Sequence, residues 1–238
     1  MPTFLQLCFC LLLGGSITNA AASAATPPRI HAQYNVLKGD MKVGTINETY
    51  TRTQDSYIVE STWKAVGLLA MFKAETIQVT SSGNITAQGL QPITYIHKRK
   101  LDSKRNTRAE FDWNAQRITL TDRNGTRTLP LPAGTQDRLS AMYQFMFAKI
   151  KDATSLEFSM TNGSKVDIYS YQITPDESVT VPLGKFKATY LASPKRRNEN
   201  RTEIWLATEH FNFPYKMILT ESEGGSLTQV LTHIELKH

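Results

Sequence analysis

Short runs in which apolar and polar residues alternate occupy most of this chain. Alternation with a period of two is the pattern of a β-strand that has one buried and one exposed face. The first two runs have the pattern of a hairpin over 31–53, with Lys38-Gly39-Asp40 as its turn. The short spacing of the runs predicts an antiparallel meander. The later predicted strands span 57–66, 72–80, 93–100, 107–113, 118–122, 156–160, 166–173, 179–183, 186–191, 204–207, 215–220 and 227–236.

One segment has the periodicity of a helix instead. Its apolar residues, which recur at steps of three and four, are Leu139, Met142, Tyr143, Met146, Phe147 and Ile150. This spacing places the side chains on one helix face and predicts a helix over 136–151, with the side-chain oxygen of Thr135 or Asp137 as its cap. The fold class that we expect is mainly β: a strongly curved antiparallel sheet or incomplete β-barrel with this one long helix packed on its concave side.

The first 24 residues have the features of a secretory signal peptide. An uncharged apolar run covers 4–13, and Ala22-Ser23-Ala24 forms a small-residue cleavage site. A run of this length is too short to span a bilayer. We therefore expect a signal peptide over 1–24, a single β-rich domain over 25–238 and a periplasmic location. Cleavage would remove Cys8 and Cys10, the only cysteines in the sequence, and with them any disulfide or thiolate chemistry.

The predicted interior combines aromatic and polar side chains. Phe111 and Trp113 share one strand face, and Tyr169 and Tyr171 share another face with Asp167. A mixed interior of this kind suits a lumen that is partly open to solvent. The aromatic residues that we expect to bind a ligand there are Trp63, Phe72, Trp113, Phe147, Tyr169, Tyr171 and Trp205.

Positive charge is concentrated in two segments. The chain has a formal net charge of +6, and residues 97–108 and 194–201 together hold ten basic and two acidic residues. If the two segments lie on one rim, they would attract an anionic headgroup or membrane surface, at about 1 kcal/mol per basic residue. The alternative is a solvated surface. No RNA-binding aromatic motif accompanies the charge, so we expect no nucleic-acid partner. The predicted headgroup or partner contacts are Arg99, Arg105, Arg196 and Arg197.

An apolar run follows Gly67 and contains Leu68, Leu69, Met71 and Phe72. It is too apolar for a free turn. Packing in the core is the commoner fate of such a run. The alternative is that it lines a hydrophobic opening and contacts a membrane or an acyl chain.

A series of short motifs resembles the bacterial exported family known as domain of unknown function 3108. The motifs occur in order over nearly all of the chain after the signal peptide: Tyr34 and Gly44 in the first hairpin, Leu90-Gln91-Pro92, Phe111-Asp112-Trp113, Gln136-Asp137-Arg138-Leu139-Ser140 before Tyr143-Gln144, Val181-Pro182-Leu183-Gly184-Lys185-Phe186, Ile204-Trp205-Leu206 and Phe213-Pro214-Tyr215-Lys216. The chain departs from the family pattern at Arg138, where Pro or a small residue is common, and in the basic insert around Lys195. The resemblance implies a periplasmic β protein similar in outline to barrel or half-barrel lipid carriers. It implies no catalytic residues.

The sequence gives little support to catalysis. The histidines lack the close spacing of zinc sites, and the nucleophile motif G-x-S-x-G is absent. Asp112 and Asp137 are the one candidate acid–base pair, but a turn role for Asp112 and a cap role for Asp137 explain both residues. We therefore expect no metal, no cofactor and no catalytic residue.

These patterns favour a non-enzymatic periplasmic envelope protein that binds an apolar or amphipathic ligand, such as a lipid, in the concavity of its curved sheet. One alternative is a structural or interaction module with a filled core, whose basic loops recruit another envelope protein. The other is a hydrolase or lyase that acts on cell-wall or polysaccharide material.

Overall fold

The fold is described by a computed structural model that covers residues 26–72 and 74–237. The strands of the first half are β1 (Arg29–Lys38), β2 (Met41–Thr53), β3 (Ser56–Ala65), β4 (Thr76–Thr86), β5 (Gly89–Arg99), β6 (Thr107–Asp112), β7 (Arg117–Asp122) and β8 (Gly125–Pro130). Those of the second half are β9 (Gln136–Asp137), β10 (Ser155–Thr161), β11 (Val166–Val181), β12 (Gly184–Ala192), β13 (Arg201–Ala207), β14 (Phe213–Thr220) and β15 (Ser226–Lys237). The helices are α1 (Gly67–Phe72) and α2 (Ser140–Gln144), and the 3₁₀ turns are η1 (Ser103–Arg105) and η2 (Thr208–His210). The predicted signal peptide lies outside the described residues.

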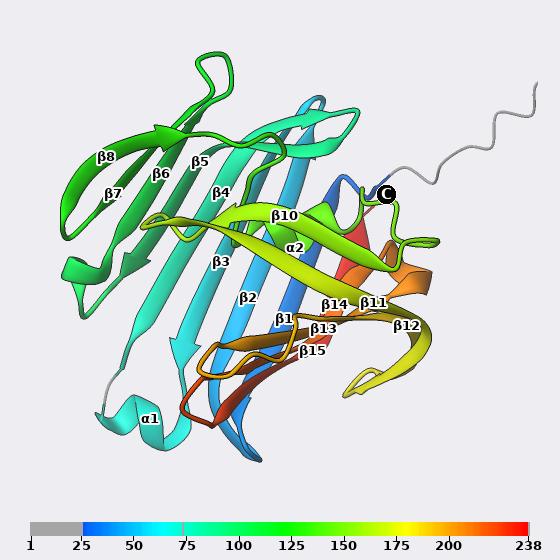
Figure 1. Cartoon of the computed structure of the whole chain (residues 1–238). Coiled ribbons are helices and arrows are strands. Elements are labelled where there is room, and N and C mark those ends of the chain that lie inside the picture. Colours follow the sequence, from blue (N-terminus) through cyan, green and yellow to red (C-terminus); the bar gives the residue numbers. More distant parts are fainter. Residues whose placement is uncertain (1–25, 73, 238) are drawn as a thin grey trace, which may run out of the picture.

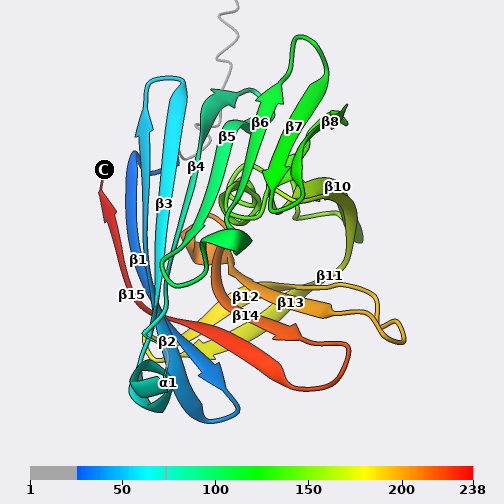
Figure 2. The same ribbon diagram turned by 90° about the vertical axis from the view of Figure 1, so that its left-hand side faces the viewer.

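All fifteen strands belong to one sheet, in the order β8-β7-β6-β5-β4-β3-β2-β1-β15-β14-β13-β12-β11-β10-β9. Neighbouring strands are antiparallel except for β9 and β10. The sheet curls around α2, so that β10 and β11 face the long strands β2–β5 across the interior (Figures 1 and 2). The prediction of a mainly β protein with one strongly curved, unclosed sheet is therefore confirmed.

Register aligns inward-facing side chains of β2–β5 into two rows on the concave face. The first, which we name the Glu48 row, consists of Glu48, Ser61, Val79 and His97 as successive cross-strand partners. The second, the Trp63 row, consists of Ile46, Trp63, Ile77 and Arg99. Cross-strand neighbours on one face lie close enough to interact directly. The two rows therefore form continuous strips of wall from the middle of the sheet toward its β8 edge.

The prediction of one long helix over 136–151 is wrong. The α-helix covers only Ser140–Gln144, and the following amides of Met146 and Phe147 bond three residues back, as in tighter 3₁₀ turns. Two sets of tertiary contacts account for this. Tyr143 packs in the larger core cluster, whereas Phe145 and Ile150 pack in a second one. A straight helix with the predicted stripe has a single apolar face and would not serve both clusters.

The apolar run after Gly67 does not pack in the core, which is the commoner fate of such a run. It forms the short helix α1, in which no residue is buried, and β4 begins only at Thr76 rather than at residue 72. The prediction that the run packs in the core is thus wrong. The alternative, an apolar segment beside an opening, describes its position.

Smaller corrections concern strand boundaries. The predicted strands 166–173 and 179–183 are one strand, β11, and β8 was not among the predicted strands. Ser82-Gly83-Asn84, which has the composition of a turn, lies inside β4. A Cβ on Gly83 would lie 2.1 Å from the carbonyl oxygen of Gln91 on β5, so glycine is required there by the close approach of a neighbouring strand. Within the described part of the chain, neither helix has the length and apolarity needed to cross a membrane.

Candidate functional site

Three cavities adjoin one another along the concave side of the sheet. A deep cavity of about 240 Å³ lies between the Glu48 row and α2. A cationic cavity of about 730 Å³ lies beside β5, η1 and the β7–β8 and β10–β11 turns. An apolar cavity of about 570 Å³ lies between the Trp63 row and α1. Tyr95, His97 and Arg138 line both the deep and the cationic cavity, and Arg99 lines both the cationic and the apolar one.

The deep cavity contains a buried carboxyl group. Glu48 accepts hydrogen bonds from Ser61 Oγ at 2.9 Å and from the Tyr143 hydroxyl at 3.1 Å. Burial raises the pKa of Glu48 above its ordinary value, and the two hydrogen bonds oppose that shift only in part. The Tyr143 ring stacks on Tyr50 with centroids 5.3 Å apart. These contacts fix α2 against the wall and leave only a small space beside Glu48.

Asp137 holds the start of α2. Its Oδ1 accepts hydrogen bonds from the backbone N–H groups of Leu139 and Ser140, at 2.8 Å each, and its Oδ2 accepts one from Ser81 Oγ at 2.6 Å. Burial raises the pKa of Asp137 to about 6, although these bonds favour the carboxylate. Of the two predicted caps, Asp137 is therefore the one that satisfies the first free amides; Thr135 instead donates to the carbonyl of Pro132.

Five basic side chains line the cationic cavity. They are Arg99, Lys104, Arg105, Arg123 and Arg138. Asp122 is the one carboxylate among the residues that line it, and its side chain already bonds Arg127 at 3.1 Å and the Asn124 amide at 2.8 Å. Burial and the nearby Arg99 lower the pKa of His97, which favours its neutral form. The cavity is thus built to attract an anion.

The apolar cavity combines aliphatic and aromatic walls. Trp63 and Ile77 form its sheet side, and Leu68, Leu69 and Phe72 of α1 form the other side. The indole of Trp63 fits because its neighbour is glycine: a Cβ on Gly44 would lie 2.4 Å from Trp63 Nε1. Lys38, Lys42 and Arg99 are the charged residues of this cavity, and no carboxylate lines it.

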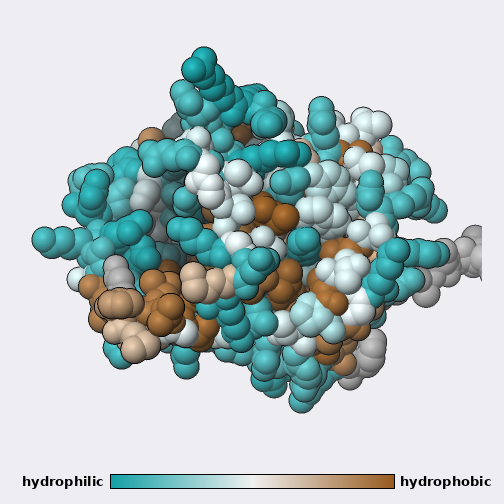
Figure 3. Space-filling model, turned by 90° about the horizontal axis from the view of Figure 1, so that it is seen from below, coloured by the Kyte–Doolittle hydropathy of each residue, from teal (hydrophilic) through white to brown (hydrophobic). Residues whose placement is uncertain are grey.

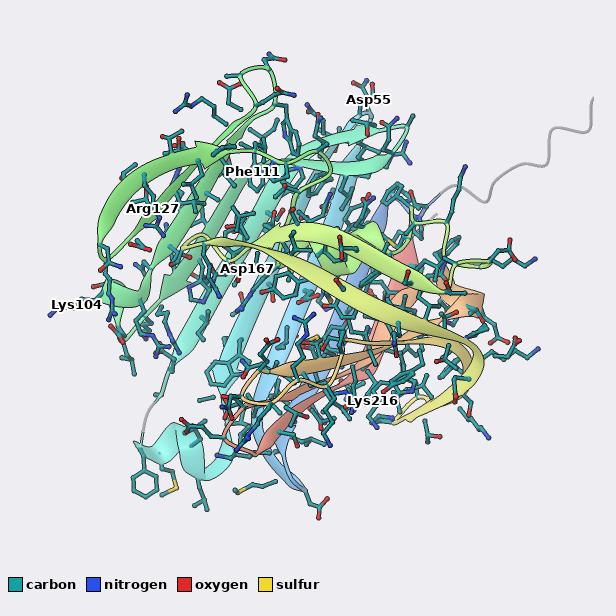
Figure 4. All side chains as sticks on the ribbon, viewed as in Figure 1. Asp55, Lys104, Phe111, Arg127, Asp167 and Lys216 are labelled. Atoms are coloured by element: carbon teal, nitrogen blue, oxygen red, sulfur yellow. The ribbon has the colours of Figure 1, made fainter. Side chains whose placement is uncertain are left out.

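The structure brings together some of the predicted site residues and separates the others. Trp63 and Phe72 line the apolar cavity, and Arg99 and Arg105 line the cationic one. The two groups meet at Arg99. Figure 4 shows Arg127 and Asp167 beside the β10–β11 turn, which borders the cationic cavity.

The remaining aromatic residues have packing roles. Trp113 stacks on Phe111 and donates to the Pro92 carbonyl at 2.6 Å, and Phe147 packs against the larger core cluster. The other three take part in ring contacts or the second cluster: Tyr169, Tyr171 and Trp205. None of these five lines a described cavity.

The second basic segment does not join the first at a cavity. Arg196 and Arg197 lie in the exposed loop between β12 and β13, and Arg196 pairs with Glu199 at 3.5 Å. The cationic cavity is completed instead by Arg123 and Arg138. No sequence signal pointed to Arg123, whereas Arg138 is a position at which the chain departs from the family pattern.

The two carboxyl groups of the candidate acid–base pair have structural contacts. Asp112 is exposed and accepts the amide of Ala115 at 2.8 Å, as a turn residue does. Asp137 is buried, and both of its oxygens are occupied as described above. The turn and cap roles expected for the two residues account for their contacts.

Comparison with solved structures shows that this fold has known relatives. A β-barrel-like protein of the domain of unknown function DUF1849 from Brucella abortus superposes with a TM-score of 0.59 at 10% identity, over 89% of this chain and 99% of the other. A Bacteroides fragilis protein with a YmcC-like fold gives a TM-score of 0.37 at 10% identity, over 88% and 96% of the two chains. No curated protein matches the sequence.

The family of the chain follows from the sequence itself. The model of the family described as "Protein of unknown function (DUF3108)" matches residues 31–232, from β1 into β15. The match includes all the motifs that suggested this resemblance and all three cavities. The chain therefore belongs to the DUF3108 family, and its fold is a curved, barrel-like sheet.

Proposed function

We propose that this protein is a non-enzymatic, periplasmic envelope protein that binds an anionic amphiphile along its concave face. The apolar part of the ligand occupies the cavity between Trp63 and α1, and its anionic group occupies the cationic cavity. The observation that carries the proposal is the position of Arg99, whose side chain borders both cavities. A molecule with one apolar end and one negatively charged end matches this arrangement.

The dimensions and chemistry of the two cavities support the assignment. Both volumes, about 570 and 730 Å³, fall in the range of about 300–1,000 Å³ that is typical of small-molecule sites. Arginine guanidinium groups bind phosphate and carboxylate through paired hydrogen bonds. Burial of an apolar chain contributes about 25 cal/mol per Å². The deep cavity is below that range, so we assign the ligand to the two larger ones.

Binding of single-chain lipids tests the proposal. Isothermal titration below the micelle concentration compares lysophosphatidylglycerol, which is anionic, with lysophosphatidylcholine, which is zwitterionic. We expect tighter binding of the anionic lipid. The variant Arg105→Gln should weaken that binding roughly tenfold, because it removes a charge-assisted hydrogen bond. Arg117→Gln is the matched control, since Arg117 is exposed and lines none of the cavities.

Two results would remove the proposal. One is the absence of binding of either lipid, together with no lipid in native mass spectra or solvent extracts of the purified protein. The other is equal weakening by Arg105→Gln and Arg117→Gln, which would indicate a general effect of net charge. Trp63→Ala should weaken binding of both lipids, because Trp63 forms the apolar wall.

The second candidate function is an interaction module that recruits another envelope protein. It is favoured by α2, which fills the middle of the concave side, and by the exposed loop of Arg196 and Arg197. Capture of a partner that depends on these two arginines and is indifferent to lipid would support this candidate over ligand binding.

A further inference from the structure

The short helix α1 exposes apolar side chains that the fold does not use. Phe72 is 87% exposed, Met71 79%, Leu68 61%, and Met41 at the start of β2 53%. No residue of α1 is buried. We name these four residues the α1 patch. Figure 3 shows apolar residues gathered at the α1 end of the molecule and bordered by hydrophilic ones. Since isolated exposed apolar residues are common but a contiguous group is not, the α1 patch marks a contact surface.

Positive charge accompanies the α1 patch. Lys38 and Lys42 line the apolar cavity beside α1, and Lys64 is exposed on the strand that leads into it. Asp40 is the acidic residue of the β1–β2 turn. Phe and Leu side chains with flanking lysines are the combination by which short segments insert at a lipid interface, because the apolar groups enter the acyl region while the ammonium groups stay at the headgroups.

We propose that the α1 patch docks on the surface of an anionic lipid membrane. The proposal rests on exposed side chains and flanking charge, and is independent of whether the cavities hold a ligand. Such a surface attracts basic residues that lie close to it. Docking would also bring the apolar cavity to the membrane, because Leu68 and Phe72 both belong to the α1 patch and line that cavity.

Flotation with vesicles tests this docking. Purified protein is mixed with vesicles of phosphatidylcholine alone or of phosphatidylcholine with 30% phosphatidylglycerol, at low and high salt. We expect flotation with the anionic vesicles and loss of it at high salt. The double variant Met71→Ser, Phe72→Ser should reduce partitioning at least roughly tenfold, because two large apolar groups no longer enter the bilayer. Ile168→Ser is the matched control, since Ile168 is 70% exposed on β11, away from the α1 patch.

A second pair of variants separates charge from apolar contact. Lys38→Gln with Lys42→Gln should reduce flotation with anionic vesicles, whereas Lys185→Gln with Lys187→Gln on β12 should not. Equal flotation of the double serine variant and wild type would overturn the proposal. So would binding to neutral vesicles that is as strong as binding to anionic ones. A patch that binds another protein but no vesicle would overturn it as well.

The test also separates docking from ligand binding. Met71 does not line the apolar cavity, so Met71→Ser alone should weaken flotation and leave binding of monomeric lysophosphatidylglycerol unchanged. Failure of flotation with normal lipid binding contradicts only the docking. Normal flotation without lipid binding contradicts only the proposed function.

Discussion

The Nε atom of Arg99 lies 3.5 Å from Oε2 of Glu75, at the point where the apolar and cationic cavities meet. Glu75 is buried, and its other oxygen accepts the backbone N–H groups of Thr76 and Leu101 at 3.2 and 3.1 Å. The carboxylate is therefore fixed by the start of β4 and by the segment that follows β5. The ion pair restricts the Arg99 side chain, which lowers the entropic cost of binding an anion.

Arg99 and Arg105 should differ in what they contribute to stability. Arg99→Gln removes the cation beside a buried carboxylate and should lower the free energy of unfolding by about 2 kcal/mol. Arg105→Gln, at an exposed position, should change it by less than about 0.5 kcal/mol. Urea unfolding measures both. We expect both variants to bind the anionic lipid more weakly, and a destabilising Arg105→Gln would contradict the distinction.

Asp137 should make stability depend on pH. Because its folded pKa of about 6 is above the ordinary value of 3.8, the folded state holds the proton more tightly than the unfolded state does. Stability from this group is therefore full below about pH 4 and falls as the pH rises to about 6, by about 3 kcal/mol. Glu48, whose pKa is also raised, acts in the same direction.

Asp137→Asn removes this titration and keeps an oxygen for the two α2 amides. The difference in unfolding free energy between the variant and wild type should grow from pH 4 to pH 6 and then stay constant. Asp137→Ala, which also loses the acceptor, should be less stable than the Asn variant by about 1–3 kcal/mol at every pH. A difference that is independent of pH over this range would show that Asp137 does not titrate there.

Tyr143 links α2 to the sheet through its ring and its hydroxyl, and two variants separate the contributions. Tyr143→Phe removes the hydrogen bond to Glu48 and keeps the ring stacked on Tyr50, so it should cost about 1 kcal/mol. Tyr143→Ala also opens a cavity and should cost about 3–5 kcal/mol. Chemical unfolding distinguishes them. Equal losses would mean that the ring contributes nothing beyond its hydroxyl.

Gly44 and Trp63 should be energetically coupled. A methyl group on Gly44 overlaps the indole, so Gly44→Ala should cost about 1–3 kcal/mol and change the shape of the apolar cavity. In the background Trp63→Leu the same substitution should cost much less. The double-mutant cycle reports the interaction directly. Additive effects would show that the overlap is relieved by movement elsewhere.

Local sequence pattern was sufficient to predict most strands but not the cavities. On β6 the alternation of apolar and polar residues matches burial: Ala109 and Phe111 are buried, and Arg108 and Glu110 are exposed. The alternation carried no information on which residues pair across neighbouring strands. The alignment of Glu48 with His97 arises only when four strands pair, so no local pattern could place a carboxyl group opposite α2.

The prediction of one long helix over 136–151 was wrong for a related reason. A period of 3.6 describes one apolar face, whereas the chain after Gln144 divides its side chains between two core clusters. The side-chain amide of Gln144 also bonds β5 and the turn before it: it accepts from the Leu90 N–H at 2.7 Å and donates to the Gln88 carbonyl at 2.8 Å. These are tertiary contacts between residues far apart in sequence, and they override the local preference.

The pairing of β1 with β15, in which Arg29 lies opposite Lys237, has a consequence for how the molecule is assembled. Among the described strands, the centre of the sheet joins the first to the last, so this contact closes a longer loop than any other strand pairing does. Closure of so long a loop is slow. Each arm, β1–β8 and β9–β15, consists of neighbours in sequence and has only local loops to close. Each arm should therefore fold by itself first, and the pairing of β1 with β15 should form last.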